Sequence, residues 1–419
     1  MPTFFSVTCV AMPDSAAPAS TLIQWKEAGV AHSALWRSER GAAPPRRMVE
    51  ADDTMAADDA YRLACEGTGL LWRGDFQNAR QMVQALARRI DKPPKASKLA
   101  RVATKKAADN AISGAPAGQD FHLHRQAQSQ RARVLGMVLI EFVADYSIAL
   151  RRAPDAKQAC AQAWGLADTD ETAGGSVASL RELLGVISAH EWRRRGVEIP
   201  ALGKAPNNRI HPHYGVFSPV RGEYVDLVAN APLPPCRGTK FVAFDIGTGT
   251  GVLSAVLALR DEVDQVVATD LDPRALECAR DNIYRLRLPN PVKVMQADLF
   301  PEGLASVIVC NPPWLPARPS SPLEGAVYDE GSRMLLGFLN GLSAHLAPGG
   351  EGWLILSNFA EKLGLRSRAE LLAAIKTAGL QVLGRIDAKP EHPKAADAGN
   401  PLHKARAAEV TSLWRLGAL

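Results

Sequence analysis

The 419-residue sequence lacks the features that mark secreted and membrane proteins. No apolar run approaches the roughly 18 residues that a membrane-spanning helix needs. Residues 1–20 contain no basic segment of the kind that opens a secretory signal. No internal repeat is evident. We therefore expect a cytoplasmic protein with no membrane partner.

Paired cysteines are also lacking. The chain has six cysteines, none forms a Cys-x-x-Cys pair, and none has a histidine at a spacing typical of zinc sites. This pattern predicts a reducing compartment and no metal site. The six are Cys9, Cys65, Cys160, Cys236, Cys278 and Cys310.

Acidic residues are missing from one long stretch of a mildly basic chain, whose formal net charge is +5. Between Lys92 and Lys106 there are six basic residues and no acid, and basic residues continue to Arg133. We interpret residues 91–120 as a basic linker. It is either a solvated tether or an electrostatic arm for phosphate backbones.

Composition and periodicity divide the chain into three parts. Residues 1–20 are rich in Ala, Pro and Ser and are predicted to be disordered. Residues 21–200 are predicted to form a mainly helical accessory domain. Residues 206–419 alternate strand and helix patterns, which predicts an α/β fold with a parallel sheet covered on both faces.

Within the accessory domain, the sequence predicts an amphipathic helix from Thr21 to about Arg40. It also predicts helices at 75–90, 156–164 and 176–195. Asp75 is the expected N-cap of the first of these three. The Glu66–Gly69 segment reads as a turn.

The stretch from Phe241 to Gly251 has the strongest pattern in the chain. An apolar strand at 241–244 leads into glycines 247, 249 and 251, and a helical pattern follows. The third glycine comes one residue earlier than in the dinucleotide fingerprint. Asp245, before the turn, would repel a pyrophosphate but suits a cationic amino-acid group. The pattern therefore favours S-adenosylmethionine over NAD.

Acidic residues follow the next two predicted strands, and ligands of open α/β sheets bind at the carboxyl ends of strands. Asp270 ends the strand at 265–270 and is placed to accept ribose hydroxyls. Asp298 follows the strand at 292–297. It either accepts from an adenine amino group, with Leu299 packed on the ring, or simply begins a loop. Asp272, before a proline, is the expected N-cap of the intervening helix.

The fourth predicted strand, 306–310, runs directly into Asn311-Pro312-Pro313-Trp314. Two prolines stiffen the backbone and remove two N–H donors, leaving carbonyl groups, the Asn amide and an indole ring. These groups suit a planar NH2 group: the Asn311 side-chain oxygen and the Pro312 carbonyl accept its hydrogens, and Trp314 stacks on its plane.

The segments FDIGTGTG, VVATDLD, QADLF and IVCNPPW, in this order, resemble the class I S-adenosylmethionine-dependent methyltransferases. The Asn-Pro-Pro-aromatic signature is that of the amino-methylating branch, which includes small-methyltransferase domains and release-factor glutamine methyltransferases. The resemblance implies a Rossmann-like sheet of seven strands with the last antiparallel. It implies S-adenosyl-L-methionine as cofactor, bound by Asp245, Gly247, Thr248, Gly249, Gly251, Asp270, Leu271, Asp298, Leu299 and Asn311. The expected catalytic residues are Asn311, Pro312, Pro313 and Trp314.

The stretch that begins at Phe217 resembles the substrate-side segment of the glutamine methyltransferases. The family's Pro-Arg-Pro-Glu-Thr-Glu core is present only through Arg221 and Glu223, and Trp314 stands where those enzymes usually carry tyrosine. We expect Phe217, Arg221 and Trp314 to contact the substrate.

The motifs predict a monomeric N-methyltransferase whose acceptor is a planar amino group. The basic stretch favours an exocyclic base amine of RNA, ribosomal RNA first. The alternatives are N5 of a glutamine in a ribosomal protein or release factor, a small-molecule amine, and a module that binds the cofactor or RNA without turnover.

Overall fold

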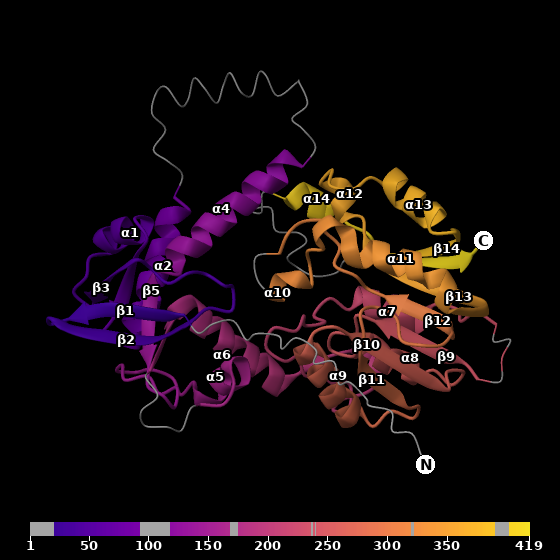
Figure 1. Cartoon of the computed structure of the whole chain (residues 1–419), viewed down its shortest axis with the longest axis horizontal. Coiled ribbons are helices and arrows are strands. Elements are labelled where there is room, and N and C mark those ends of the chain that lie inside the picture. Colours follow the sequence, from indigo (N-terminus) through magenta and orange to yellow (C-terminus); the bar gives the residue numbers. More distant parts are fainter. Residues whose placement is uncertain are drawn as a thin grey trace, which may run out of the picture.

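The computed structural model describes residues 21–92, 118–167, 175–235, 238, 240–319, 322–389 and 402–419. These residues form two α/β units, which Figure 1 shows side by side, the N-terminal unit at left and the C-terminal unit at right. The predicted disordered segment 1–20 and most of the predicted linker, 93–117, lie outside the described residues.

The C-terminal unit contains a sheet of seven strands in the order β11-β10-β9-β12-β13-β15-β14. β15 pairs antiparallel with both of its neighbours, and the other pairs are parallel. The predicted seven-stranded sheet with an antiparallel last strand is confirmed. The strands are β9 (Val242–Ile246), β10 (Gln265–Asp270), β11 (Val292–Gln296), β12 (Ala305–Cys310), β13 (Leu346–Ser357), β14 (Leu380–Ala388) and β15 (Thr411–Ala418).

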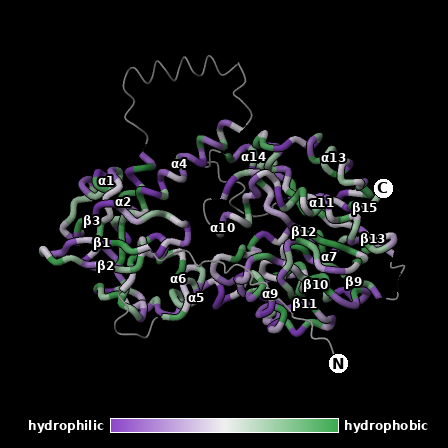
Figure 2. Tube along the Cα trace, in the orientation of Figure 1, coloured by the Kyte–Doolittle hydropathy of each residue, from purple (hydrophilic) through white to green (hydrophobic). Residues whose placement is uncertain are grey.

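Helices cover both faces of this sheet. Along β9 and β12, alternate residues enter opposite cores: Ala243 packs with α7 and α8, and Phe244 packs with α11 and α13. Figure 2 shows hydrophobic colouring along these central strands, as expected for strands buried on both faces. The helices are α7 (Glu223–Asn230), α8 (Val252–Ala258), α9 (Pro273–Leu286), α10 (Pro322–Gly325), η2 (Glu330–Ser332), α11 (Arg333–His345), α12 (Phe359–Lys362), α13 (Arg368–Thr377) and α14 (His403–Ala407).

The N-terminal unit is not mainly helical, which corrects the prediction. It contains a sheet of six strands in the order β1-β2-β6-β5-β4-β3. The strands are β1 (Leu22–Glu27), β2 (Val30–Arg37), β3 (Arg47–Ala51), β4 (Thr68–Trp72), β5 (Val138–Phe142) and β6 (Ser176–Ser179). The helices are α1 (Ala57–Cys65), α2 (Phe76–Ile90), α4 (Gln119–Leu135), α5 (Lys157–Trp164) and α6 (Leu180–Arg195).

The predicted helix from Thr21 to Arg40 is wrong, because this segment is the hairpin β1–β2. Ile23 and Trp25 are buried while their neighbours are exposed, which is the two-residue period of a strand. Ala28 and Gly29 turn the chain with φ values of 48° and 84°. Six residues of alternation are a weak signal, and strand pairing decides the structure here.

Two further short strands were missed. The predicted helix at 176–195 begins as β6 and becomes α6 only at Leu180. The predicted turn at 66–69 runs into β4, all five residues of which are buried. Predictions with strong helical periodicity are confirmed: α2 begins after Asp75, whose carboxylate accepts from the backbone N of Gln77, and α5 lies where expected.

The two units contact each other through three ion pairs, which we call the seam. Arg274 binds Glu39 at 2.8 Å, Arg125 binds Glu324 at 3.3 Å, and Arg193 binds Asp281 at 3.2 Å. α4 reaches from the N-terminal unit toward α14, as Figure 1 shows. Its residue Phe121 is buried in a cluster with Leu315, Phe359 and Leu402 of the C-terminal unit. The chain between the units forms β7 (Val197–Glu198), η1 (Pro200–Leu202) and β8 (Arg209–Ile210).

No helix within the described ranges is long and apolar enough to cross a membrane.

Candidate functional site

The predicted site residues lie at one edge of the C-terminal sheet. β9 pairs in parallel with β10 on one side and with β12 on the other, and Ile246 is in register with both Thr269 and Cys310. The residues at and directly after the ends of these strands therefore meet at the same carboxyl edge. They are Asp270, the turn at 247–251 and Asn311.

The glycine turn has the backbone conformation that its composition predicts. Gly247, Gly249 and Gly251 have φ values of 72°, 54° and 79°, in the left-handed region that residues with a Cβ rarely adopt. A Cβ on Gly251 would lie 3.2 Å from the Cα of Ala279 in α9. The glycines thus allow both the left-handed turn and the close approach of α9.

Asp245 is 1% exposed at the end of β9. Its Oδ2 accepts hydrogen bonds from Thr248 Oγ1 at 2.7 Å, Ser254 N at 3.0 Å and Ser254 Oγ at 2.5 Å. Its Oδ1 has no hydrogen-bond partner among the described residues. Burial raises the pKa of Asp245, although the three hydrogen bonds oppose that shift. This carboxyl group therefore lacks a cationic neighbour that would stabilise its charge.

Asp270 connects the turn to the end of β10. Its Oδ2 accepts from Gly249 N at 2.9 Å, and its Oδ1 accepts from Asp272 N at 3.0 Å. Burial raises the pKa of Asp270 as well. Asp272 caps α9 by accepting from Arg274 N at 2.9 Å, as the Asp-Pro sequence predicts. Leu271, between the two acids, is 46% exposed beside this edge.

Asn311 and Trp314 form a hydrogen bond with each other. Trp314 Nε1 donates to Asn311 Oδ1 at 2.9 Å, which leaves the second lone pair of that oxygen for another donor. The bond also identifies the side-chain oxygen of Asn311, because an indole N–H can only donate. The arrangement orients the Asn311 amide before any acceptor binds.

Arg221 covers one face of the Trp314 ring, with its guanidinium carbon 5.2 Å from the ring centroid. It also binds Glu223 at 2.8 Å and Glu409 at 3.2 Å. Glu409 is 5% exposed and accepts a 2.6 Å hydrogen bond from Ser357 Oγ. Arg221 is therefore held in place beside the aromatic ring, while Phe217 is 39% exposed four residues earlier.

Asp298, the third acidic residue of the predicted site, has different surroundings from Asp245 and Asp270. Asp298 is exposed and forms an ion pair with Arg333 at 2.8 Å. Leu299 has a φ of 72°, its carbonyl accepts from Thr269 Oγ1 at 2.6 Å, and its side chain packs against Gly337 of α11. The expected adenine contacts of Asp298 and Leu299 stay predictions.

The part of the chain that contains these residues matches a known protein family. Residues 207–368 match the family model described as "Methyltransferase small domain". This part of the chain is a methyltransferase small domain. The resemblance drawn from the four sequence motifs is confirmed for it.

Three relatives match stretches of the chain that are shorter than this domain. A release factor glutamine methyltransferase of Moorella thermoacetica is 35% identical over 29% of this chain and 44% of that protein. A ribosomal protein uL3 glutamine methyltransferase of Bordetella pertussis is 34% identical over 32% and 47%. A tRNA1(Val) (adenine(37)-N6)-methyltransferase of Histophilus somni is 38% identical over 17% and 32%. The chain spans less than half the length of each.

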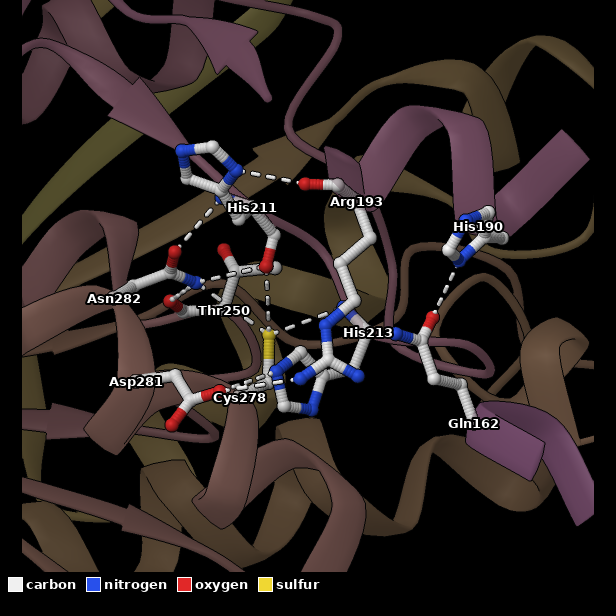
Figure 3. Close-up of polar contacts among 9 residues, drawn as sticks. All are labelled: Gln162, His190, Arg193, His211, His213, Thr250, Cys278, Asp281 and Asn282. Carbon is white, nitrogen blue, oxygen red and sulfur yellow. Dashed lines mark hydrogen bonds and ion pairs between the residues drawn. The ribbon is translucent and has the colours of Figure 1, made fainter. Parts of the chain in front are cut away.

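The methyltransferase small domain contains positioning residues that the sequence reasoning missed. Asn282 of α9 is fully buried, and its side-chain amide donates to the Thr250 carbonyl at 3.0 Å and accepts from His211 N at 2.7 Å (Figure 3). It thereby joins the glycine turn to the segment around His211, near the start of the domain. An Asn on the apolar stripe of a predicted helix was the available signal. No sequence pattern pointed to Glu409 and Ser357, because these two residues come together only when the chain folds.

His211 and His213 form hydrogen bonds with other groups of the protein. His213 is 7% exposed and its Nε2 lies 3.0 Å from Asp281 Oδ2, which also accepts from Arg193 (Figure 3). Burial, and next the charge of Arg193, lower the pKa of His213. In the part of the chain that the structure describes, no group of three or more His, Cys, Asp or Glu residues is arranged to hold a metal ion.

A cavity of about 1700 Å³ lies between the N-terminal unit and the methyltransferase small domain. We call it the interdomain cavity. Among the described residues, its lining includes seven arginines and four glutamates, and no lysine or aspartate. Ser218 and Val220 line it immediately before Arg221, and Tyr328, which bridges to Leu315 beside Trp314, lines it on the other side. The cavity therefore adjoins the segments that hold the candidate acceptor site.

Proposed function

We propose that the chain is an S-adenosylmethionine-dependent N-methyltransferase whose acceptor is a planar amino group. The observation that carries this proposal is the Asn311–Trp314 arrangement at the end of β12, beside a glycine turn preceded by a buried carboxyl group. The matched family supports the reaction class, and it implies S-adenosyl-L-methionine as the methyl donor.

The residues at the glycine turn fit this donor. Asp245 is a buried carboxyl group with one oxygen free of hydrogen bonds among the described residues, and its raised pKa reflects the missing positive charge. The α-ammonium group of a bound donor would supply that charge beside Asp245. Asp270 lies at the next strand end, where it can accept from ribose hydroxyls. A Cβ on Gly249 would meet no atom within 4 Å, so at this glycine the backbone of the turn is open to the ligand.

The acceptor residues act on the nitrogen. The lone pair of an amide or exocyclic amine is delocalised, so the nitrogen is a weak nucleophile. Asn311 Oδ1 and the Pro312 carbonyl accept its two hydrogens and draw the group toward a tetrahedral geometry, which localises the lone pair. The donor, when bound, supplies a methyl group on a sulfonium: the C–S bond breaks as the C–N bond forms.

No strong base is required, because the methylated nitrogen is acidic and loses its proton to water. A buried carboxylate that pairs with Arg221 beside Trp314 agrees with this view: Glu409 is bonded to Arg221 and to Ser357 and is not available as a base. Orientation of nucleophile and donor then supplies much of the rate.

Two acceptors fit these groups. A glutamine side-chain amide in a translation-related protein is favoured by the relatives that are named as glutamine methyltransferases. An exocyclic amine of an RNA base is favoured by the arginine-rich interdomain cavity and by the relative named for adenine-N6 methylation of tRNA. The relatives support the glutamine acceptor more strongly than the RNA acceptor.

The test is transfer of tritiated methyl groups to ribosomal RNA and tRNA in one set of reactions, and to ribosomal proteins and release factors in another. Asn311→Ala is expected to lower kcat by about 100-fold or more, because an oriented polar group at the reacting atom is removed. Donor affinity, measured by calorimetry, should change less than threefold. Asn230→Ala, on the exposed end of α7, is the control.

Trp314→Phe should give a smaller loss of about tenfold in kcat, since it removes only the hydrogen bond that orients Asn311. Label in no RNA and no protein would refute both acceptors. Full turnover by Asn311→Ala would refute the role of the amide.

A further inference from the structure

The interdomain cavity holds more positive charge than its own carboxylates neutralise. Glu39, Glu66 and Glu324 are each paired with an arginine, and Glu182 accepts a 2.6 Å hydrogen bond from the backbone N of Glu39. Five of the seven lining arginines have no carboxylate partner among the described residues. They are Arg40, Arg46, Arg47, Arg133 and Arg181.

Arg181 shows how the excess of unpaired arginines affects one side chain of the cavity. Its Nη1 is buried and has no hydrogen-bond partner among the described residues. Burial, and then the nearby charges of Arg40 and Arg131, lower the pKa of Arg181. A buried N–H group without an acceptor is destabilising, and an anion in the cavity would remove that penalty.

Aromatic rings are placed among these arginines. Trp192 is 48% exposed, and Tyr214 and Tyr328 have guanidinium carbons of Arg274 and Arg125 5.9 and 4.1 Å from their ring centroids. Arginine matches phosphate geometry with two parallel hydrogen bonds, and aromatic faces stack on unpaired bases. Alternating arginine and aromatic residues in one cavity are typical of surfaces that bind single-stranded nucleic acid.

The volume and position of the cavity restrict further which class of ligand it can bind. Its volume of about 1700 Å³ exceeds the roughly 300–1,000 Å³ of ordinary small-molecule pockets. Its lining comes from both units and includes Val220, next to Arg221, and Tyr328, which bridges to Leu315 next to Trp314. A chain molecule that lies in the cavity can therefore extend toward Asn311.

We propose that the interdomain cavity binds the ribose-phosphate backbone of a single-stranded RNA segment, whose exposed base reaches Asn311. The N-terminal unit is then a substrate-binding unit, and the arginines of both units fix the strand without reading its sequence. This inference rests on the proposed methyltransferase function for its last step, but not for binding.

Binding is measured with the full-length protein and a fluorescent 20-nucleotide RNA of mixed sequence, over 50 to 300 mM salt and without methyl donor. Arg46→Gln/Arg47→Gln is expected to weaken binding by roughly tenfold at low salt. It should also flatten the slope of log K against log salt by about 1.4, or 0.7 per lost phosphate contact on a single strand. The control is Arg88→Gln/Arg285→Gln, which removes two exposed arginines outside the cavity and should change neither quantity.

Arg181→Gln separates binding from folding. It should weaken RNA binding while Tm stays the same or rises, because it removes the buried Nη1 group that has no hydrogen-bond partner among the described residues. A fall in both Tm and affinity would overturn the role of Arg181 in binding RNA.

Equal losses in the Arg46/Arg47 and control variants would overturn the proposal. The proposal would also be overturned if a polyglutamate peptide bound and RNA did not, and if that peptide binding depended on Arg46 and Arg47. The catalytic proposal is tested separately: RNA binding retained by Asn311→Ala, with no methyl transfer to any acceptor by the unaltered protein, would refute catalysis and leave the RNA site intact.

Discussion

Asp245 has opposite effects on folding stability and on ligand binding. Its carboxyl group is buried at the end of β9 with one oxygen bonded three times and the other without a partner among the described residues. Burial raises its pKa above the usual 3.8, so the ionised form is disfavoured in the folded protein. The residue thus opposes folding at neutral pH and, by the proposed function, favours binding of a cation.

Asp245→Asn should therefore raise Tm at neutral pH. The stability contribution of a carboxyl group with a raised pKa is greatest below pH 3.8 and falls as pH rises through the folded-state pKa. The Tm gap between variant and unaltered protein should accordingly shrink as pH falls toward 4, measured by calorimetry from pH 4 to 8. Donor affinity should fall by about tenfold or more through loss of a charge-assisted hydrogen bond.

Asp261→Asn, which alters an exposed carboxylate, is the control and should shift neither quantity. An unchanged donor affinity in Asp245→Asn would contradict the assignment of Asp245 to the donor's ammonium group.

The glycine turn between β9 and α8 shows how much one element's conformation depends on its neighbours. Local sequence predicts the turn, because only glycine tolerates three left-handed positions so closely spaced. The third glycine also lies against the backbone of α9. That helix is placed by Asn282, which donates to the turn's Thr250 carbonyl.

Gly251→Ala should destabilise the protein by about 1–2 kcal/mol, since alanine at a φ of 79° is strained and its Cβ would approach Ala279 within 3.3 Å. Urea unfolding followed by circular dichroism measures the change. Gly185→Ala, within α6 and with open space around the new Cβ, should instead stabilise by up to about 1 kcal/mol. The same sign for both substitutions would contradict this account.

At the scale of elements, prediction succeeded where the signal was long or chemically specific. β10 has the predicted bounds, and α2 begins after the predicted cap, Asp75. The hairpin β1–β2 and the four-residue β6 were mistaken for helix. β1 and β6 are short, and β2 also pairs with β6, which lies far away in the sequence, so local periodicity was a poor guide.

At the scale of the whole molecule, the contact between the two units includes a buried titratable group. This group is His213, which lies beside the Arg193–Asp281 ion pair of the seam. It faces Asp281, Glu277 and Cys278 of α9 and Arg193 of α6, and its pKa is lowered, chiefly by burial. The folded protein therefore keeps this histidine neutral at a pH where an unfolded one, with a pKa of 6.5, begins to bind a proton.

Stability should consequently decline as pH falls from 7.5 through 6.5 toward the lowered folded-state pKa of His213. His213→Gln should flatten this decline, measured as Tm between pH 7.5 and 5.5, and limited proteolysis should show the units separating less readily in acid. His32→Gln, an exposed position on β2, is the control. The same pH slope in the unaltered protein and His213→Gln would contradict the role of the buried imidazole.

The sequence by itself determined the order of strands and helices in the C-terminal unit and the chemistry of its edge. Parallel strands bring their carboxyl ends together, so the glycine turn, Asp270 and Asn311 had to meet once the strands were recognised. Only the tertiary structure decided which distant groups support them: Glu409 on Arg221, Asn282 on the turn, and the arginines of two units around one cavity. These contacts join residues far apart in the chain, and packing of whole elements creates them, so no local pattern encodes them.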